Sequence, residues 1–236
     1  MKKKLLFIGC LLSFFGAFAQ QVTGAWERQH LSEQGEKVRS VVIFAEGYQA
    51  IAKYALETGR FISSNGGTWK LSGNIITEVV EFDSKDPARV GTSSSFKVRI
   101  QDTLLVLPDA GIQYTRIDNG NPGALKGAWL MTGRTVDGQT QARDTSSARK
   151  TMKILSGSRF QWIAYQTDSK QFMGTGGGSY TTVDGAYTEH IEFFSRDSSR
   201  VGSSLNFKFK LIKGTWHHTG LSSKGDPLNE QWSLRQ

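Results

Sequence analysis

Short segments rich in apolar, β-branched and aromatic residues recur along the chain every eight to twelve residues, with turns between them. Such segments occupy residues 40–44 and 48–52 in the first half, and residues 150–155 and 160–165 in the second. Glu46-Gly47 separates the first pair and Ser156-Gly157-Ser158 separates the second. No window of eleven or more residues has a convincing period of 3.6. The pattern therefore predicts antiparallel, all-β meanders.

The two halves of the chain repeat each other. Residues 77–99 and 188–210 lie at a fixed offset of 111, and 12 of their 23 positions are identical. Self-similarity of this length indicates duplication of a whole folding unit. We therefore expect one unit over residues 20–118 and a second over residues 119–236, with a short polar linker at the junction.

A meander that closes into a barrel removes its exposed edges, so each unit is expected to close. Each unit begins with a G-x-W motif, and each ends with an aromatic residue followed by an arginine. These features are Gly24-Ala25-Trp26 with Tyr114 and Arg116, and Gly127-Ala128-Trp129 with Trp232 and Arg235.

Both units resemble the lipocalin-type (calycin) β-barrel in these motifs. The resemblance implies an all-β fold of two tandem antiparallel lipocalin-like β-barrels. It also implies that Trp26 and Trp129 close the barrel floors, and that Arg116 and Arg235 pack across them. Because one fold hosts many activities, the resemblance bears on the fold more than on the function.

The first 19 residues are typical of a signal peptide. Three lysines precede an apolar run, and Ala17-Phe18-Ala19 forms a cleavage site. The run is too short for a transmembrane segment. We expect a periplasmic or secreted protein without a lipid anchor. Cys10 is the only cysteine, so the mature chain offers no disulfide and no thiolate nucleophile.

Charge excludes one class of partner. Removal of the three signal lysines lowers the formal net charge from +8 to +5, and the remaining basic residues are scattered. Nucleic-acid binding requires a clustered basic surface, so we expect no nucleic-acid partner.

The differences between the two copies indicate a site in the second. Val79 corresponds to His190, and Leu107 corresponds to His218. His190 and Glu192 share one face of a strand, and Trp216 shares a face with His218. If these faces point inward, the second barrel holds two imidazoles and a carboxylate, and this set suits ligand binding or general acid–base catalysis. The alternative is a set of hydrogen-bonded polar residues on a solvent-facing surface.

Four aromatic residues are candidates for the walls of a ligand cavity: Trp162, Tyr165, Tyr180 and Trp216. No H-x-H or H-E-x-x-H motif is present, so we expect neither a metal nor another cofactor. The glycine-rich stretch at residues 174–178 lacks the lysine and helix of a phosphate loop, and we interpret it as a turn.

The sequence thus predicts an exported protein that binds a small, partly apolar molecule in its second barrel. One alternative is a cofactor-independent lyase, isomerase or hydrolase that uses His190, His218 and Glu192. Another is a periplasmic or surface interaction scaffold. The oligomeric state is left open by the sequence.

Overall fold

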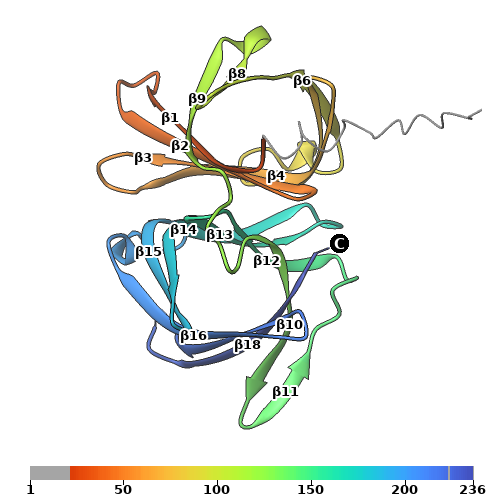
Figure 1. The fold of residues 1–236 in the computed structure, drawn as a ribbon, viewed down its shortest axis with the longest axis vertical. Helices are drawn as coiled ribbons and strands as arrows, with labels where there is room; N and C mark the ends of the chain where they lie inside the picture. The colour runs from red at the N-terminus through yellow and green to blue at the C-terminus, as the bar shows by residue number, and fades with distance from the viewer. Residues whose placement is uncertain (1–21, 223, 236) are drawn as a thin grey trace, which may run out of the picture.

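The computed structural model describes residues 22–222 and 224–235, and it shows two antiparallel β-barrels that pack against each other (Figure 1). The expected signal peptide, residues 1–19, lies outside the described residues. No helix in the described part of the chain has the length and apolar character needed to cross a membrane.

The first barrel is a nine-stranded sheet that is nearly closed. Its two edge strands, β6 and β7, are separated along the chain by Val98 alone. In sheet order the strands are β6 (Ser93–Lys97), β5 (Ile75–Asp83), β4 (Phe61–Ser72), β3 (Tyr48–Ala55), β2 (Lys37–Ala45), β1 (Gly24–Leu31), β9 (Ile112–Asp118), β8 (Leu104–Leu107) and β7 (Arg99–Gln101).

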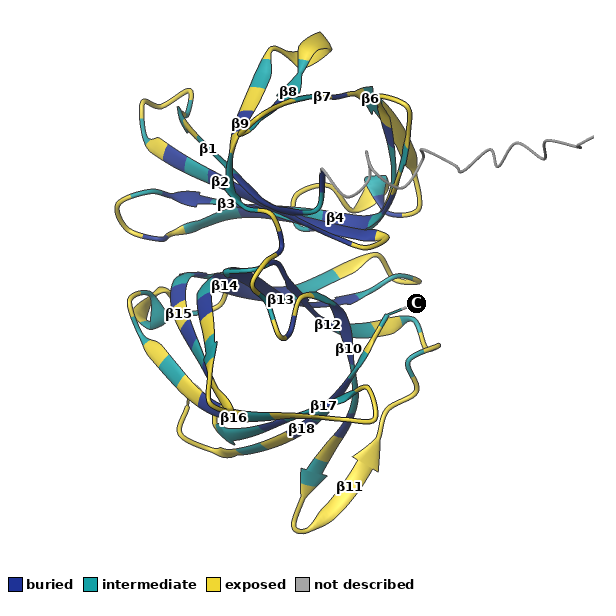
Figure 2. Cartoon of the chain, in the orientation of Figure 1, coloured by how far each residue is buried: buried dark blue, intermediate teal, exposed yellow. Residues whose placement is uncertain are grey.

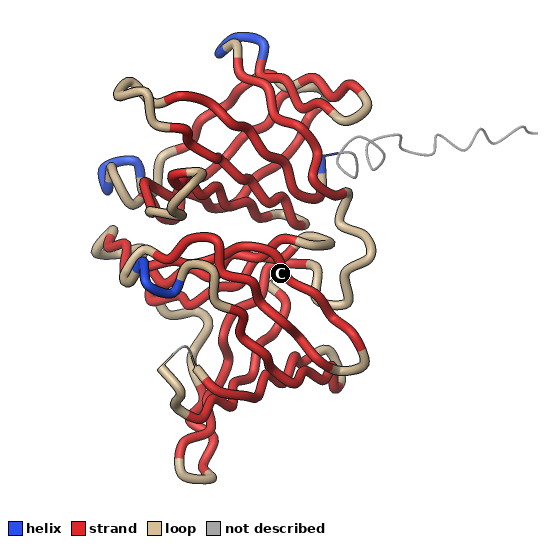
Figure 3. The backbone as a smooth tube through the Cα atoms, turned by 90° about the vertical axis from the view of Figure 1, so that its left-hand side faces the viewer, coloured by secondary structure: helices blue, strands red, loops and turns tan. Residues whose placement is uncertain are grey.

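The second barrel is closed by pairing between β10 and β18. Its strands are β10 (Gly127–Val136), β11 (Gln139–Ala142), β12 (Arg149–Leu155), β13 (Arg159–Gln166), β14 (Gln171–Val183), β15 (Ala186–Phe194), β16 (Ser204–Ile212), β17 (Thr215–Leu221) and β18 (Pro227–Leu234). β10 and β11 form a hairpin that extends away from the barrel wall (Figure 3). Three short 3-10 turns lie at Pro87–Arg89, Pro108–Ala110 and Ser198–Arg200.

The glycine-rich stretch expected to be a turn lies inside β14, so that expectation is wrong. The pairing of β14 with β15 shifts register between Gly177 and Gly178. A Cβ atom on Gly178 would lie only 1.9 Å from the carbonyl oxygen of His190, and Gly67 is equally close to Val79 in the first barrel. Glycine is required here because two backbones approach closely at a β-bulge.

The floor of the first barrel matches the resemblance. The guanidinium carbon of Arg116 lies 3.9 Å from the ring centroid of Trp26, and Trp26 Nε1 donates a hydrogen bond to the carbonyl of Val22. Trp129 makes the equivalent bond to Leu125.

Arg235, in contrast, does not cover Trp129, and this expectation is wrong. The strand register places Arg116 opposite Trp26 but Leu234 opposite Trp129. Arg235 is the next residue, so its side chain leaves on the other face of the wall. It reaches the first barrel instead, where its guanidinium lies 4.2 Å from the ring centroid of Tyr48.

The barrels pack through the outer faces of β2–β5 and β12–β15, where Figure 2 shows many buried residues. One apolar cluster contains residues from both barrels, including Ile43 and Phe82 from the first and Ile154 and Ile163 from the second. Alternate residues of β2, such as Val42 and Phe44, face the interior of the first barrel. A strand buried on both faces is apolar without alternation, which explains the uninterrupted run at residues 41–45.

Polar contacts across this interface are reciprocal. Tyr54 of the first barrel donates a hydrogen bond to Glu192 of the second at 2.8 Å, and Tyr165 of the second donates to Glu81 of the first at 2.6 Å. These two contacts are related by the 111-residue offset. Phe61 and its equivalent Phe172 stack on each other, with their ring centroids 6.0 Å apart. The interface is therefore isologous, like that of a twofold-symmetric homodimer.

Arginines complete both contacts. Glu192 accepts from Arg159 at 2.5 and 2.6 Å and from Arg39 at 2.9 Å. Burial alone would raise the pKa of Glu192, but Arg159, Tyr54 and Arg39 together hold it below its ordinary value. Arg235 makes a bidentate contact with Glu81 at 2.7 and 2.8 Å. Bidentate arginine–carboxylate pairs fix geometry as well as charge.

We predict that Glu192→Ala lowers the free energy of unfolding by about 2–3 kcal/mol, because it leaves the buried Arg159 guanidinium without its carboxylate. Lys37→Ala is the matched control, since its ion pair with Glu57 is exposed and contributes about 0.5 kcal/mol or less. Urea unfolding followed by tryptophan fluorescence measures both. Equal effects of the two variants would contradict a structural role for the interface charges.

Candidate functional site

The interior of the second barrel contains a buried ion pair. Lys153 Nζ on β12 lies 2.7 Å from Glu189 Oε1 on β15, and both side chains are almost fully buried. The hydroxyl of Tyr187 donates to the same carboxylate oxygen at 2.8 Å. The ammonium also lies 5.1–5.7 Å from the centroids of four aromatic rings, those of Tyr187, Phe207, Trp216 and Trp232. Such a site stabilises a cation through its carboxylate and through ring quadrupoles.

His218 and Glu230 lie beside this pair. His218 Nδ1 is 3.5 Å from Glu230 Oε2, and Trp232 Nε1 donates to the same carboxylate oxygen at 3.2 Å. Burial, reinforced by Lys153, lowers the pKa of His218 to about 4, so its imidazole is neutral at pH 7. Although burial opposes it, contact with His218 and Lys153 lowers the pKa of Glu230. The charged side chains of this interior are therefore one lysine, Lys153, and two glutamates, Glu189 and Glu230.

Three buried nitrogen atoms in this interior have no hydrogen-bond partner among the described residues. They are Trp216 Nε1 and both ring nitrogens of His218, of which Nδ1 has only the 3.5 Å contact with Glu230 Oε2, a distance too long for a good hydrogen bond. Buried polar atoms are nearly always paired, and leaving one unpaired costs about 1–3 kcal/mol. Their concentration in one place marks the centre of the second barrel as the candidate site.

His190 does not join this group. It is exposed, and its Nδ1 lies 2.8 Å from the hydroxyl of Ser204. On β15 the inward positions belong to Tyr187, Glu189 and Ile191, which are all buried. The expectation that His190 lies inside the barrel with His218 is therefore wrong, because the larger apolar residues of the strand take the inner face.

Glu192 shares the outer face with His190, as the strand period predicted, but that face is covered by the first barrel at residue 192. Its carboxylate is held by Arg159 and Arg39 in the interface rather than beside His218. The described residues contain no group of three or more histidine, cysteine, aspartate or glutamate side chains placed to hold a metal.

Three of the four candidate aromatic residues face the interior of the second barrel. Trp216 is fully buried there, and the hydroxyl of Tyr180 donates to the carbonyl of Ser156 at 2.6 Å. Trp162 is partly buried in the same cluster, 5.5 Å from Phe194. Tyr165 instead faces the interface, where it is bonded to Glu81.

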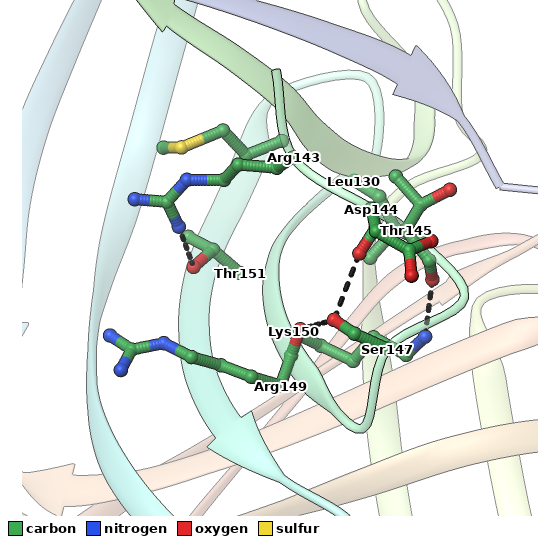
Figure 4. Close-up of a pocket in the computed structure, with 9 residues that line it drawn as sticks. Leu130, Arg143, Asp144, Thr145, Ser147, Arg149, Lys150 and Thr151 are labelled. Atoms are coloured by element: carbon green, nitrogen blue, oxygen red, sulfur yellow. Dashed lines mark hydrogen bonds between the residues drawn. The ribbon is translucent and has the colours of Figure 1, made fainter. Parts of the chain in front are cut away.

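A pocket of about 230 Å³ lies where β10 and β12 separate (Figure 4). β10 pairs with β12 only as far as Leu130 and then continues with β11. Met131 and Thr151 line the pocket, and Met131 also packs on the aromatic interior. Arg143 donates to the hydroxyl of Thr151 at 3.4 Å. Arg143, Arg149 and Lys150 also line the pocket, and no residue of the group around Lys153 and His218 does.

Sequence reasoning missed Lys153, Glu189 and Glu230, which form most of the buried charge. One signal was available: Lys153 and Val42 are equivalent at the 111-residue offset, so a lysine stands at a predicted core position of the second copy. Glu189 was harder to recognise because Glu78 stands at the same place in the first copy.

Glu78 has no lysine opposite it. It forms no hydrogen bond or ion pair with any residue that the structure describes. Burial raises its pKa to about 7, with a small opposing effect from Arg89. The two barrels thus keep the same inward carboxyl group but only the second one neutralises it.

Comparison with known proteins gives a match over part of the chain and no activity. Residues 124–233, which include the whole strand region of the second barrel up to β18, match the model of a domain of unknown function, DUF4488. No curated protein matches the chain.

We predict that His218 makes the protein less stable in mild acid. Its folded pKa of about 4 lies below the ordinary 6.5. As pH falls from 6.5 towards 4, His218 therefore becomes protonated in the unfolded chain but stays neutral in the folded protein. This difference lowers the free energy of unfolding by up to about 3 kcal/mol. His218→Leu, the residue of the first copy, should remove this loss, whereas His190→Val should not. Urea unfolding between pH 4 and 7 would contradict this if both variants behaved alike.

We predict the opposite pH dependence for Glu78. Its folded pKa of about 7 lies above the ordinary 4.5, so its stabilisation is complete below pH 4.5 and is lost as pH rises to 7. Because the side chain is partly exposed, we expect a loss of about 2 kcal/mol. Glu78→Gln should abolish it, and Val42→Lys should reduce it by supplying the missing ammonium. The same unfolding series tests both, and an unchanged slope in both variants would contradict the prediction.

Proposed function

We propose that this is an exported small-molecule-binding protein with its site inside the second barrel. The observation that supports the proposal most directly is the set of unpartnered nitrogens on Trp216 and His218, which are surrounded by aromatic rings. An apolar site with a few converging polar groups is the usual composition of a ligand site. Export is inferred from the signal sequence alone.

The charge and the hydrogen-bonding groups of the interior limit the class of ligand that it can bind. The interior carries one more carboxylate than ammonium, which favours a neutral or cationic ligand over an anion. The tryptophan nitrogen can only donate, whereas a neutral imidazole offers one donor and one acceptor. We therefore expect a partly apolar molecule with at least one hydrogen-bond acceptor.

The enzymatic alternative has less support. It requires His190 and His218 to act together with Glu192, but His190 lies outside the barrel wall and Glu192 lies in the interface. His218 alone, neutral at pH 7, offers one buried base beside Glu230.

The scaffold alternative is favoured by one observation, the interlocked interface. Reciprocal tyrosine–glutamate bonds and two arginine–carboxylate contacts hold the barrels in one orientation. A rigid pair of this kind presents a fixed surface to a partner. It also gives a rigid wall to a ligand site, so this feature is compatible with both functions.

The test is a thermal-shift screen of the mature chain against compact neutral and cationic aromatic compounds. A compound present at a concentration of 100 times its Kd stabilises the folded protein by about 2.7 kcal/mol, which corresponds to a rise of a few degrees in Tm. We expect the rise in the wild type and in His190→Val, and its loss in His218→Leu and Trp216→Phe. No rise with any compound, or a rise that survives all three substitutions, would contradict the proposed site.

A further inference from the structure

The first barrel carries a row of inward polar residues that the second barrel lacks. Strand pairing places Arg28 of β1 opposite Ser40 of β2, Ser40 opposite Lys53 of β3, and Lys53 opposite Ser63 of β4. Residues directly opposite each other in a sheet share a face, so these four residues form one continuous row. Cationic and hydroxyl side chains alternate along it.

This row faces the inside of the barrel. Two residues further along each strand, Trp26, Val42 and Ile51 form the neighbouring row, and all three belong to the apolar cluster of the first barrel. Side chains two residues apart on a strand point to the same side. Arg28 and Lys53 therefore project inward, one layer above the apolar floor closed by Trp26.

Neither cation is neutralised. Arg28 and Lys53, both half-buried, make no hydrogen bond or ion pair with any residue that the structure describes. The nearby carboxylate of Asp83 is already paired with Arg89 at 2.7 Å. Burial, together with the positive charges of Lys85, Arg28 and Arg89, lowers the pKa of Lys53, and Asp83 opposes this effect only in part.

The spacing suits a shared anion. Arg28 and Lys53 are separated by one strand, so their Cα atoms are about 10 Å apart. Ser40, small and almost fully buried, lies between them and leaves the space above it to the two long side chains. An oxyanion at this point would accept charge-assisted hydrogen bonds from both. In the second barrel Met131, Thr151 and Ala164 stand at the places of Arg28, Ser40 and Lys53, and all three are uncharged.

We propose that the first barrel binds an organic or inorganic oxyanion, a carboxylate or a phosphate, between Arg28 and Lys53. The apolar row at Trp26, Val42 and Ile51 lies next to this point and would contact any apolar body attached to the anionic group. This site is independent of the one proposed in the second barrel and differs from it in the sign of the charge that it prefers.

Titration calorimetry of the mature chain at low ionic strength, with phosphate, acetate and octanoate as probes, tests the site. Each charged hydrogen bond is typically worth 1.5–3 kcal/mol, so Lys53→Gln and Arg28→Gln should each weaken binding by about tenfold or more. Lys70→Gln removes an exposed cation from the outer face of β4 and should bind as the wild type does. Tighter binding of octanoate than acetate would identify a carboxylate with an apolar body, and tighter binding of phosphate would identify a phosphoryl group.

Two further variants separate the possible failures. Lys53→Met relieves repulsion among the cations, so its Tm without ligand should equal or exceed that of the wild type while its anion binding is lost. His218→Leu, which disables the proposed second-barrel site, should leave anion binding unchanged. The proposal is overturned if no probe binds the wild type at millimolar concentration, or if Lys53→Gln and Arg28→Gln bind the probes as tightly as Lys70→Gln does.

Discussion

The reciprocal bonds between Tyr54 and Glu192 and between Tyr165 and Glu81 are the constraint on which the rest of the structure depends. A carboxylate cannot be buried between two sheets without compensation, because removal from water costs several kcal/mol per ion. Arg159, Arg39 and Arg235 provide that compensation, and each must approach from a defined direction. These contacts fix the relative orientation of the two barrels. The side chains that form them are engaged in the interface and are not available to bind a ligand.

The interface also determines which residues of each wall remain for the interior. On the strands that it covers, outward residues belong to the shared core and inward residues belong to each barrel separately. Glu192 and Tyr165 are interface residues for this reason, whereas Lys153 and Trp216 are interior residues. Duplication preserved the outward set on both sides, as the equivalence of Glu81 with Glu192 and of Tyr54 with Tyr165 shows. The inward set is retained at the floor tryptophans and at Glu78 and Glu189, but it differs where Val42 corresponds to Lys153.

Much of the fold could be predicted from the sequence, since β periodicity and the repeat at an offset of 111 lead directly to two all-β units. The G-x-W motifs led correctly to the stacking of Arg116 on Trp26. The misplacement of Arg235 could have been avoided, because Arg116 lies two residues after Tyr114 whereas Arg235 lies three residues after Trp232. An odd spacing along a strand reverses the face to which a side chain points. His190 was misassigned for a related reason. Alternation shows which residues share a face, but only the packing of Tyr187 and Ile191 decides which face is inner.

The two interiors differ most in how they handle charge. The second barrel joins Lys153 to Glu189 across its centre and keeps His218 neutral, so its remaining charge is negative. The first barrel has Val42 in place of the lysine, raises the pKa of Glu78 to about 7 by burial, and places Arg28 and Lys53 one layer higher. Burying charged side chains in either barrel lowers the stability of the fold, and nothing in the fold itself requires those charges. Together they are what two copies of one barrel would become if each had specialised for a ligand of different charge, with the rigid interface as the common part.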